Sequence, residues 1–412
     1  MSELPHAVDV VVVGAGLAGL AAARKLTLAG RQVLLAEAAD AVGGRVRTDQ
    51  LDGLLLDRGF QLLNPAYPEV RRVVDLDALR LQPFEAGAVI AHGSGRGVVG
   101  DPRRLPRDLP STLRLPLGSW REKIALARWA VEIGYGPVKR LKAQADLSLA
   151  EALGRRGLDG ALTSGVLRPF LAGVLGEDEL ATSAVFAELL VRSFVRGTPA
   201  IPAGGMQALP EQLAAGLPAG TLSLLTKVNG LHGSRVETDR GEVRARAVLV
   251  AADPVTAATL TGLPSPTMRA LTTFYYLAER PPTDRALLHL DADRRGPLVN
   301  TAVISNAAPS YAPGRHLVAA TTLGSDASTG AELAARKHAG LIYGCASADW
   351  ELVASYPIAG ALPDTPPGTL LRRDVRLGEG RYVAGDHRDT SSIQGALVSG
   401  RRAAEAVLAD LR

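Results

Sequence analysis

Hydrophobic residues near the start of the chain form a short run, then a helical segment, then a second run. Residues 10–13 are four valines followed by a glycine, a pattern typical of a parallel strand buried on both faces. The segment LAAARKLTLAG has the composition of a helix that ends at Gly30, and QVLLAE then returns to a β-rich pattern. We therefore expect a strand, a helix and a second strand at the start of the fold.

Two later stretches, 81–199 and 266–365, predict a mixture of strands and helices. The first begins with a hairpin in QPFEAGAVIAHGSGRGVVGD and continues with helices such as SWREKIALARWAVEI and TSAVFAELLVRSFV. The second contains strands around TTFYYLAE, LVNTAVISN and HLVAATTLG, and then the helix GAELAARKHAGLIYG. Near the end, YVAGDHRDTSSIQGALVSGRRAAEAVL predicts a strand, a Gly-Asp turn, a loop and a helix rich in small residues.

Length and composition limit the class of protein. A chain of 412 residues is too long for one ordinary core, so two domains are expected. The formal charge is +4, from 46 Lys and Arg against 42 Asp and Glu, and so small a dispersed excess argues against nucleic acid as a partner. Cys345 is the only cysteine, so neither an internal disulfide nor a cysteine zinc cluster can form; we expect no metal site and a cytoplasmic location. The pattern also predicts neither a secretory signal nor a membrane-spanning helix.

The glycines after the first predicted strand carry the most specific chemistry. Gly14, Gly16 and Gly19 form G-x-G-x-x-G between a strand and a helix, and Glu37 follows about twenty residues later. In this order the glycines allow a tight turn, a close approach of a pyrophosphate and close packing of helix on strand, while the acid accepts hydrogen bonds from a ribose. The alternative is a plain turn between two core elements. The predicted dinucleotide-binding residues here are Gly14, Ala15, Gly16, Leu17, Ala18, Gly19, Glu37 and Ala38.

A second G-x-G-x-x-G occurs at Gly95, Gly97 and Gly100, but its context differs. Asp101-Pro102 follows at once, and DPRRLPRDLP cannot continue as a helix. We interpret this segment as a glycine-rich turn or hairpin. No second dinucleotide site for a nicotinamide cofactor is therefore expected.

Two further segments extend the first site and suggest a family. AADAVGGRVRT places Gly43, Gly44 and Arg45 just beyond the ribose-binding acid, and DRGFQ places Gly59, Phe60 and Gln61 after the next strand. The combination of GAGLAGL, Glu37, GGR and DRGFQ resembles the superfamily of flavin-dependent amine oxidases and phytoene desaturases, which includes protoporphyrinogen oxidase. IPAGGMQALPEQLA, LLTKVNGLHGSRVETDRGEVRARAVLVAADP and the C-terminal segment are similar to later blocks of that superfamily, in the same order.

The resemblance implies an α/β fold: a Rossmann-like FAD-binding domain with an inserted α+β substrate domain. The first would comprise 1–80, 200–265 and 366–412, and the second 81–199 and 266–365. It also implies FAD as cofactor, held without a covalent bond, because Cys345 lies in YGCASADW and not in the S-G-G-C-Y pattern of covalent flavoproteins.

The resemblance assigns roles at the C-terminal segment as well. Gly385-Asp386 would bring a carboxylate to the ribityl hydroxyls, and a helix starting near Gln394 would aim its N–H groups at the flavin. Gly395, Ala396, Ser399 and Gly400 would be small so that the helix approaches the ring; the alternative is a C-terminal helix that merely packs on a sheet. The family-derived contacts are Val228 for adenine, through its backbone, and Gly385, Asp386, Ile393, Gln394 and Ala396 for the flavin end.

Catalytic residues are not assigned by the sequence. A flavin carries the electron chemistry itself, so no dedicated acid–base pair is required. Tyr275 and Tyr276 are candidates in a predicted strand, where alternation favours one in the core and one on the surface. His387 is a candidate near the ring edge, with a surface histidine as the alternative, whereas Trp120, Trp129 and Trp350 are expected to be packing residues.

Three functions remain open at this point. The first is a desaturase-like oxidoreductase that removes hydride from a C–H or C–N bond of an apolar small molecule. It is favoured because residues 385–396 contain no aromatic and because aromatic residues make up only 4% of the chain. The second is an amine or amino-acid oxidase, and the third a redox-neutral flavin-dependent isomerase.

Peripheral membrane contact is suggested by basic residues beside apolar helices, with a solvated loop as the alternative. These residues are Arg103, Arg104, Arg107 and Arg114. The oligomeric state stays open.

Overall fold

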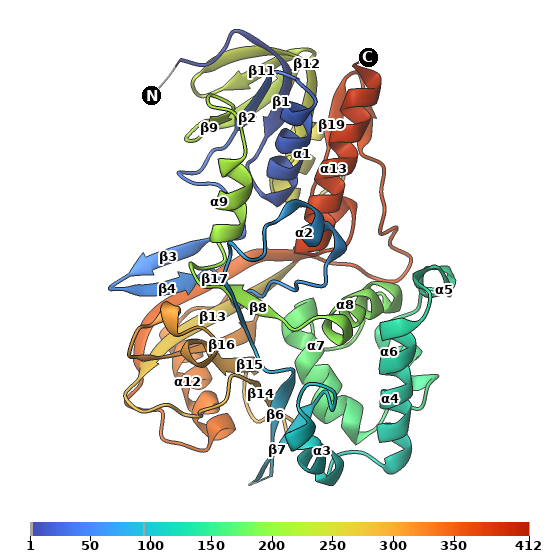
Figure 1. Cartoon of the computed structure of the whole chain (residues 1–412), viewed down its shortest axis with the longest axis vertical. Coiled ribbons are helices and arrows are strands. Elements are labelled where there is room, and N and C mark those ends of the chain that lie inside the picture. Colours follow the sequence, from blue (N-terminus) through green and yellow to red (C-terminus); the bar gives the residue numbers. More distant parts are fainter. Residues whose placement is uncertain (1–2, 94, 412) are drawn as a thin grey trace.

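The computed structural model describes residues 3–93 and 95–411, and in them two larger sheets organise the fold. The first sheet lies at the top of Figure 1 beside helices α1 and α13. The second lies at the lower left, and a group of helices, α3 to α8, lies at the lower right. Both chain termini lie at the end occupied by the first sheet (Figure 1).

The first sheet is built around the valine run at the start of the chain. Strand β1 (Ala7–Val13) pairs in parallel with β2 (Val33–Ala36) on one side and with β12 (Gly241–Val250) on the other. Strand β12 also pairs in parallel with β19 (Arg381–Val383), near the other end of the chain. Residues 10–13 are buried, as a central parallel strand requires. The other strands of this sheet are β9 (Leu222–Ser223), β10 (Val228–His232), β11 (Arg235–Thr238) and β18 (Arg376–Gly378).

Helices α1 (Leu17–Leu28) and α13 (Ile393–Asp410) pack closely against each other. The contact depends on a small residue, because a Cβ added at Gly400 would lie 2.1 Å from the carbonyl oxygen of Ala18. Helix α1 ends as expected: Gly30, at φ +76°, donates its N–H to the carbonyl of Thr27. The first and last helices of the chain thus form one layer on the first sheet.

The second sheet is mainly antiparallel. Its order is β17-β13-β16-β15-β14-β6-β7, with β14 and β6 as the parallel pair. Helix α12 (Thr329–Tyr343) packs on β14, β15 and β16. The strands are β6 (Gly87–His92), β7 (Gly95–Gly100), β13 (Met268–Ala278), β14 (Leu288–Asp291), β15 (Leu298–Val303), β16 (His316–Leu323) and β17 (Glu351–Pro363).

The helical part has its own core. Trp129 and Ile133 of α4 are each 2% exposed and pack among leucines of the neighbouring helices. The N-terminus of α4 is closed by a capping box, in which Ser119 accepts from the N–H of Glu122 and the Glu122 side chain accepts from the N–H of Ser119. These helices are α3 (Leu109–Arg114), α4 (Trp120–Tyr135), α5 (Val138–Ala143), α6 (Leu149–Gly154), α7 (Arg168–Leu175) and α8 (Ala184–Arg196).

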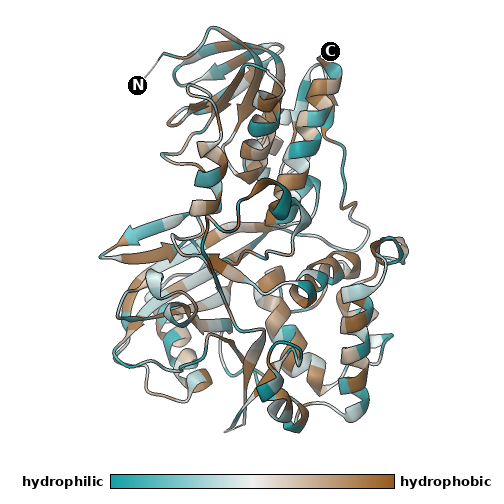
Figure 2. Cartoon of the chain, viewed as in Figure 1, coloured by the Kyte–Doolittle hydropathy of each residue, from teal (hydrophilic) through white to brown (hydrophobic). Residues whose placement is uncertain are grey.

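Short elements connect these parts. The hairpin of β3 (Thr48–Leu51) and β4 (Leu54–Asp57) has a hydrophilic strand and a buried hydrophobic one, as Figure 2 shows. A further pair, β5 (Leu81–Pro83) and β8 (Ala200–Pro202), is antiparallel. The remaining helices are α2 (Pro68–Val73), α9 (Ala208–Ala215), α10 (Pro254–Thr261) and α11 (Ile304–Ala307).

Most of the elements expected from the sequence are confirmed. The strand, helix and strand at the start, the helices in 119–196 and the three strands and helix in 272–344 all form. The second glycine pattern is a hairpin, as expected, because β6 and β7 pair from Gly87–Gly100 to His92–Gly95. The strands of the first sheet come from 7–36, 222–250 and 376–383, and those of the second from 87–100 and 268–363. The predicted division into two domains agrees with the chain segments that form each sheet, and it stays a prediction.

Two expectations about aromatic residues are wrong. Trp120 is not a packing residue: its side chain is 62% exposed at the start of α4, with the Lys123 ammonium 5.1 Å from its ring centre. Tyr275 and Tyr276 are both buried, because each face of β13 is covered by protein. In the part of the chain that the structure describes, no helix combines the length and the apolar composition needed to cross a bilayer.

Candidate functional site

The three glycines after β1 differ in what surrounds the position of a side chain. Gly14 has φ +97°, and a Cβ there would lie 2.8 Å from the carbonyl oxygen of Ala251. A Cβ at Gly19 would lie 1.9 Å from the oxygen of Gly14, so this glycine lets α1 pack against the turn. A Cβ at Gly16 would meet no atom within 4 Å. Gly16 therefore has open space beside the N-terminus of α1, where an anion is favoured.

Glu37 lies where the sequence predicts it, directly after β2. Its carboxylate accepts hydrogen bonds from the N–H of Ala15, at 2.6 Å, and from the N–H of Ala39, at 2.8 Å. A carboxylate has about four lone-pair positions, so these two bonds leave acceptor capacity for a ribose hydroxyl. Val228 begins β10, two residues after Thr226, which donates its N–H to the carbonyl of Glu37 at 2.8 Å.

The GGR segment joins the first loop. Gly43 donates its N–H to the carbonyl of Ala15 at 2.9 Å, and a Cβ at Gly44 would lie 3.4 Å from the Cα of Gly16. Positive φ values, +119° at Gly43 and +60° at Gly44, explain why this pair is glycine. The loop therefore forms a second wall beside Gly16.

Arg45 connects this loop with the C-terminal segment. Its Nη2 donates to Oδ1 of Asp386 at 2.7 Å, and its Nη1 donates to the carbonyl of Ala361 at 2.9 Å. The Arg45 side chain is 34% exposed, whereas that of Asp386 is 7% exposed. Gln61, from the predicted DRGFQ segment, donates its Nε2 to the carbonyl of Arg45 at 2.7 Å. The structure thus brings four of the predicted segments to one place.

The turn after β19 is fixed by the last helix. Gly385 donates its N–H to Oγ of Ser399 at 2.9 Å, and Ser392 caps α13 by accepting from the N–H of Gly395. Gln394 accepts from the N–H of Glu69 at 2.9 Å, which ties the first turn of α13 to α2. Gly385, Asp386, Ile393, Gln394 and Ala396 therefore lie together, although their contacts with a flavin stay a prediction.

The structure gives a different reason for the small residues of α13. A Cβ at Gly395 would lie 1.9 Å from the carbonyl oxygen of Thr390, and Gly400 is required by its contact with Ala18. Ser399 is used as a hydrogen-bond partner of Gly385. These three positions are small because of contacts inside the protein, so their size does not need a flavin ring as its cause.

These residues fit a flavin dinucleotide. Gly16 offers open space at a helix N-terminus, Glu37 retains acceptor capacity, and Arg45 is partly exposed beside a nearly buried carboxylate. Contacts run without a break from Gly16 through Gly43 and Arg45 to Asp386. A dinucleotide placed along this path would have its phosphates near Gly16 and its ribityl and ring end near Asp386.

Of the catalytic candidates, neither tyrosine is free to contact a substrate. The hydroxyl of Tyr275 donates to the carbonyl of Asp57 at 2.9 Å, and that of Tyr276 donates to the carbonyl of Glu332 at 3.2 Å. Burial raises the pKa of Tyr276 well above its ordinary value. Both side chains are packed in the core, and we interpret them as structural.

His387 is buried rather than on the surface. Burial lowers its pKa to about 4, which outweighs the opposite effect of Asp386, so the ring is neutral at pH 7. Its Nδ1 has no hydrogen-bond partner among residues 3–93 and 95–411. A buried polar atom without a partner is unusual, and it points to an interaction with something other than the protein. A role beside the flavin stays a prediction.

Sequence reasoning missed Asp57, the acid that ends β4. Its carboxylate accepts hydrogen bonds from the hydroxyl of Thr48 at 2.6 Å, the N–H of Met206 at 2.9 Å and the hydroxyl of Tyr311 at 2.8 Å. Burial raises its pKa to about 6, although these three bonds lower it. The sequence signal for Asp57 was an acid directly after the apolar run LLL. Ala361 was also not predicted, because it accepts from Arg45 through its backbone carbonyl and a backbone contact leaves no signal in the sequence.

Asp57→Asn is expected to remove a pH dependence of stability. The folded protein holds a proton on Asp57 up to about pH 6, whereas an unfolded Asp releases it near pH 4, so wild-type stability falls as pH rises between these values. The asparagine can accept from Thr48 and Met206 and donate to Tyr311, so the network should persist. Urea unfolding at pH 4 and at pH 7 should differ between wild type and variant by on the order of 2 kcal/mol.

Asp52→Asn is the matched control for this experiment. Asp52 is exposed in the turn between β3 and β4, and its replacement should leave the wild-type pH dependence in place. If Asp57→Asn kept the wild-type dependence as well, Asp57 would not be the buried group responsible.

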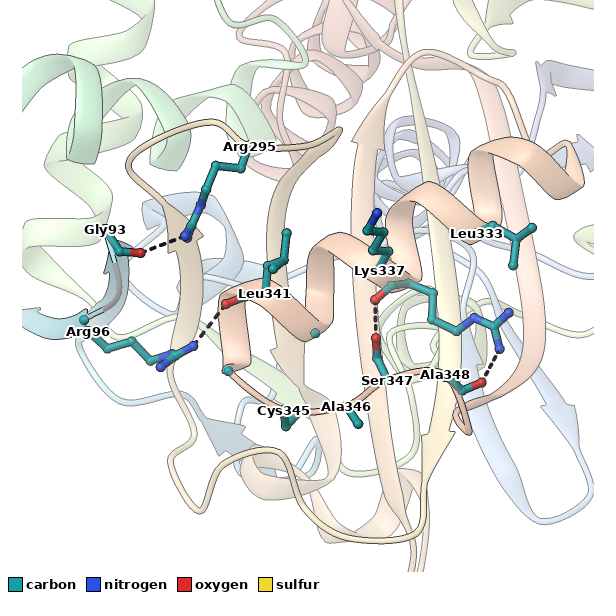
Figure 3. Close-up of a pocket in the computed structure, with 14 residues that line it drawn as sticks. Gly93, Arg96, Arg295, Leu333, Lys337, Leu341, Cys345, Ala346, Ser347 and Ala348 are labelled. Carbon is teal, nitrogen blue, oxygen red and sulfur yellow. Dashed lines mark hydrogen bonds between the residues drawn. The ribbon is translucent and has the colours of Figure 1, made fainter.

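A hollow of about 810 Å³ lies elsewhere, between α12 and the β6–β7 hairpin (Figure 3). Four cations line it, but Arg96 donates to the carbonyl of Leu341, Arg295 to that of Gly93 and Arg336 to that of Ala348. These arginines hold the backbone together. Cys345 lines this hollow, whereas none of the predicted cofactor residues does. Within the described ranges no His, Cys, Asp and Glu side chains gather as metal ligands.

Comparisons with known proteins agree with this geometry. A putrescine oxidase from Kocuria rosea is 52% identical over 67 residues, covering 16% of this chain and 14% of that protein. A 15-cis-phytoene desaturase from Arabidopsis thaliana is 29% identical over 198 residues, covering 44% of this chain and 34% of its own. The matched segments thus span about a third or less of these relatives. The structure of putrescine oxidase bound to putrescine has a TM-score of 0.71 at 20% identity, covering 98% of this chain and 99% of that one, which shows a shared fold.

The model of one protein family matches most of the chain. It is described as flavin containing amine oxidoreductase, and the match covers residues 17–408. The α/β fold with a Rossmann-like flavin-binding part and the resemblance stated from the sequence are both confirmed. The chain belongs to the family of flavin-containing amine oxidoreductases.

Proposed function

We propose that the protein is an FAD-dependent oxidoreductase that takes hydride from a C–H bond of an apolar small molecule and so oxidises a C–C or C–N bond, in the manner of a desaturase. The observation that carries this proposal is the link from Arg45 to Asp386. It joins the loop beside the helix N-terminus of α1 to the turn before α13, and in this proposal these two elements hold the two ends of a flavin dinucleotide.

The residues of the chain would hold the cofactor in sequence along this path. The N-terminus of α1 and the open side of Gly16 would bind the pyrophosphate, and Glu37 would bind the ribose. Arg45 and Asp386 would contact the ribityl chain, and the first turn of α13 would place positive partial charge beside the ring. Attachment would be non-covalent, because Cys345 lies at the hollow beside α12 and not on this path.

The proposed reaction is an oxidation of the substrate by two electrons. A bound flavin supplies an acceptor for the hydride. The substrate loses that hydride from one carbon and a proton from the neighbouring carbon or nitrogen, and a double bond forms between the two atoms. The electron pair leaves the enzyme with dioxygen or a quinone. Neutral His387 has the protonation state needed to take up a proton, and we assign it no further role.

Two alternatives remain within the family. Amine oxidation is favoured by the likeness to putrescine oxidase, whereas the residues 385–396 lack an aromatic that could flank an amine. A redox-neutral isomerisation would return the substrate with its mass unchanged. We place the desaturase-like reaction first because of the low aromatic content of the chain and the likeness to phytoene desaturase.

Purification followed by anaerobic reduction tests the proposal. The protein should show flavin absorbance, and heat or acid should release the flavin into solution, as non-covalent attachment requires. We expect phytoene to bleach the absorbance under anaerobic conditions and putrescine and L-amino acids to leave it unchanged. Bleaching by an amine with peroxide formed in air would favour the amine oxidase. A purified, folded protein that binds no FAD would overturn the proposal.

We also propose a cytoplasmic location, with a small molecule and not nucleic acid as the partner. The net charge of +4 and the single cysteine are the observations that support it.

A further inference from the structure

Helix α4 presents an apolar stripe to its surroundings. Trp120 is 62% exposed, Ile124 50%, Val131 60% and Tyr135 56%, and their spacing places them on one face of the helix. The opposite face is buried in the core of the helical part. Single exposed apolar residues are normal, but four in register on one helix form a patch. We call these four residues the α4 stripe.

Helix α3 extends this patch. Its Leu109 and Leu113 are 38% and 42% exposed. The ammonium of Lys123 on α4 donates to the carbonyls of Leu113 and Leu115, each at 2.8 Å, so the end of α3 is held against the start of α4. The two helices lie at the lower right of Figure 1, away from the first sheet. Hydrophobic and hydrophilic segments alternate along α4 in Figure 2.

The same segment has a larger net positive charge than the whole chain. Residues 101–143 contain ten Lys and Arg and four Asp and Glu, a formal +6, whereas the whole chain carries +4. The remainder is therefore net negative, and the positive charge is concentrated around the stripe. Glu132 is the exposed acid of α4 itself.

The exposed arginines that have no protein partner among the described residues are mostly not those that the sequence suggested for membrane contact. Arg103 pairs with Asp101, Arg104 donates to backbone carbonyls of the segment that ends α8, and Arg107 pairs with Glu85. These three serve the fold. Arg114, Arg121 and Arg128 are exposed, and none of them has an ion pair or side-chain hydrogen bond in the part of the chain that the structure describes.

We propose that the α4 stripe, with Leu109, Leu113 and these three free arginines, docks on a membrane surface that contains anionic lipid. A helix of this kind lies in the interface, with Trp and Tyr at the level of the headgroups and Arg beside the lipid phosphates. A second copy of the chain is a poorer occupant, because a two-fold interface here would oppose two strongly positive segments.

Co-sedimentation of the full-length protein with vesicles tests this surface. We expect binding to phosphatidylcholine mixed with phosphatidylglycerol, weak binding to phosphatidylcholine alone, and weakening by salt. Ile124→Glu/Val131→Glu should reduce the affinity by more than about 20-fold, because two apolar side chains are lost from the interface. Arg121→Glu/Arg128→Glu should reduce it by at least about 30-fold at low ionic strength.

Matched variants elsewhere on the surface control for general effects. Leu333→Glu replaces a leucine that is 50% exposed on α12, and Arg244→Glu/Arg280→Glu reverses two exposed charges outside the segment. Both should bind vesicles like the wild type, and unchanged thermal unfolding should show that every variant folds. Equal binding to neutral and anionic vesicles would overturn the proposal, and so would full binding by the α4 variants. Self-association that these variants abolish, without vesicle binding, would assign the patch to a second copy. The readout is binding alone, so it does not depend on the proposed reaction.

Discussion

Gly400→Ala is expected to lower the free energy of unfolding by about 3 kcal/mol, the largest effect that we predict for the addition of one methyl group. The new Cβ would lie 2.1 Å from the carbonyl oxygen of Ala18, whereas ordinary contacts begin beyond 3 Å. Because the obstacle is backbone, the clash can be relieved only if α1 and α13 move apart. That movement weakens the layer that covers the first sheet. Urea unfolding followed by circular dichroism measures the change.

Gly330→Ala is the matched control for Gly400→Ala. Gly330 lies in the first turn of α12, and the nearest atom to an added Cβ is 4.0 Å away. Alanine favours a helix over glycine, so this variant should be as stable as wild type or more stable by up to about 1 kcal/mol. A Gly400→Ala protein with wild-type stability would show that the two helices do not meet as closely as the structure has them.

Gly16→Val is expected to leave the fold intact and to weaken FAD binding by at least about 100-fold, equivalent to about 3 kcal/mol. Gly16 has φ −70° and ψ 177°, a conformation open to valine, and a Cβ would meet no protein atom within 4 Å. The same open side is where the phosphates are expected to approach the N-terminus of α1. Flavin absorbance after gel filtration, together with thermal unfolding of the flavin-free protein, separates loss of cofactor from loss of structure.

Gly330→Val controls for the substitution itself and should retain the flavin. If Gly16→Val retained FAD at the wild-type level, the pyrophosphate would not bind beside Gly16. The pair of predictions also separates two kinds of glycine in this protein. Gly400 is small because of contacts between helices, whereas Gly16 is small on a side that the protein leaves open.

Local patterns were sufficient to predict the first part of the site. Residues 10–13, the glycines and Glu37 lie close in sequence, and the strand, turn and helix that place them form from short-range preferences. The same holds for the hairpin at Gly95–Gly100, which the following proline identified. The order of the family's motifs then predicted that Arg45 and Asp386 both belong to the site. Nothing in either segment indicates that the two side chains pair.

What could not be predicted depends on contacts between distant segments. Both faces of β13 are covered, so alternation could not tell that Tyr275 and Tyr276 are equally buried. Asp57 has a raised pKa because it is buried, and the Thr48, Met206 and Tyr311 groups that donate hydrogen bonds to it come from three separate parts of the chain. The partners of Arg103 and Arg107 likewise depend on tertiary structure, and a count of basic residues does not show which arginines remain free.

The position of β12 has a consequence for synthesis of the protein on the ribosome. This strand lies between β1, at the start of the chain, and β19, which begins at Arg381. The nascent chain therefore exposes one edge of a hydrophobic strand until β19 has left the exit tunnel. Contacts between such distant segments form slowly, so newly made molecules should depend on chaperones, and a truncation of even the last thirty or so residues should leave an aggregation-prone product.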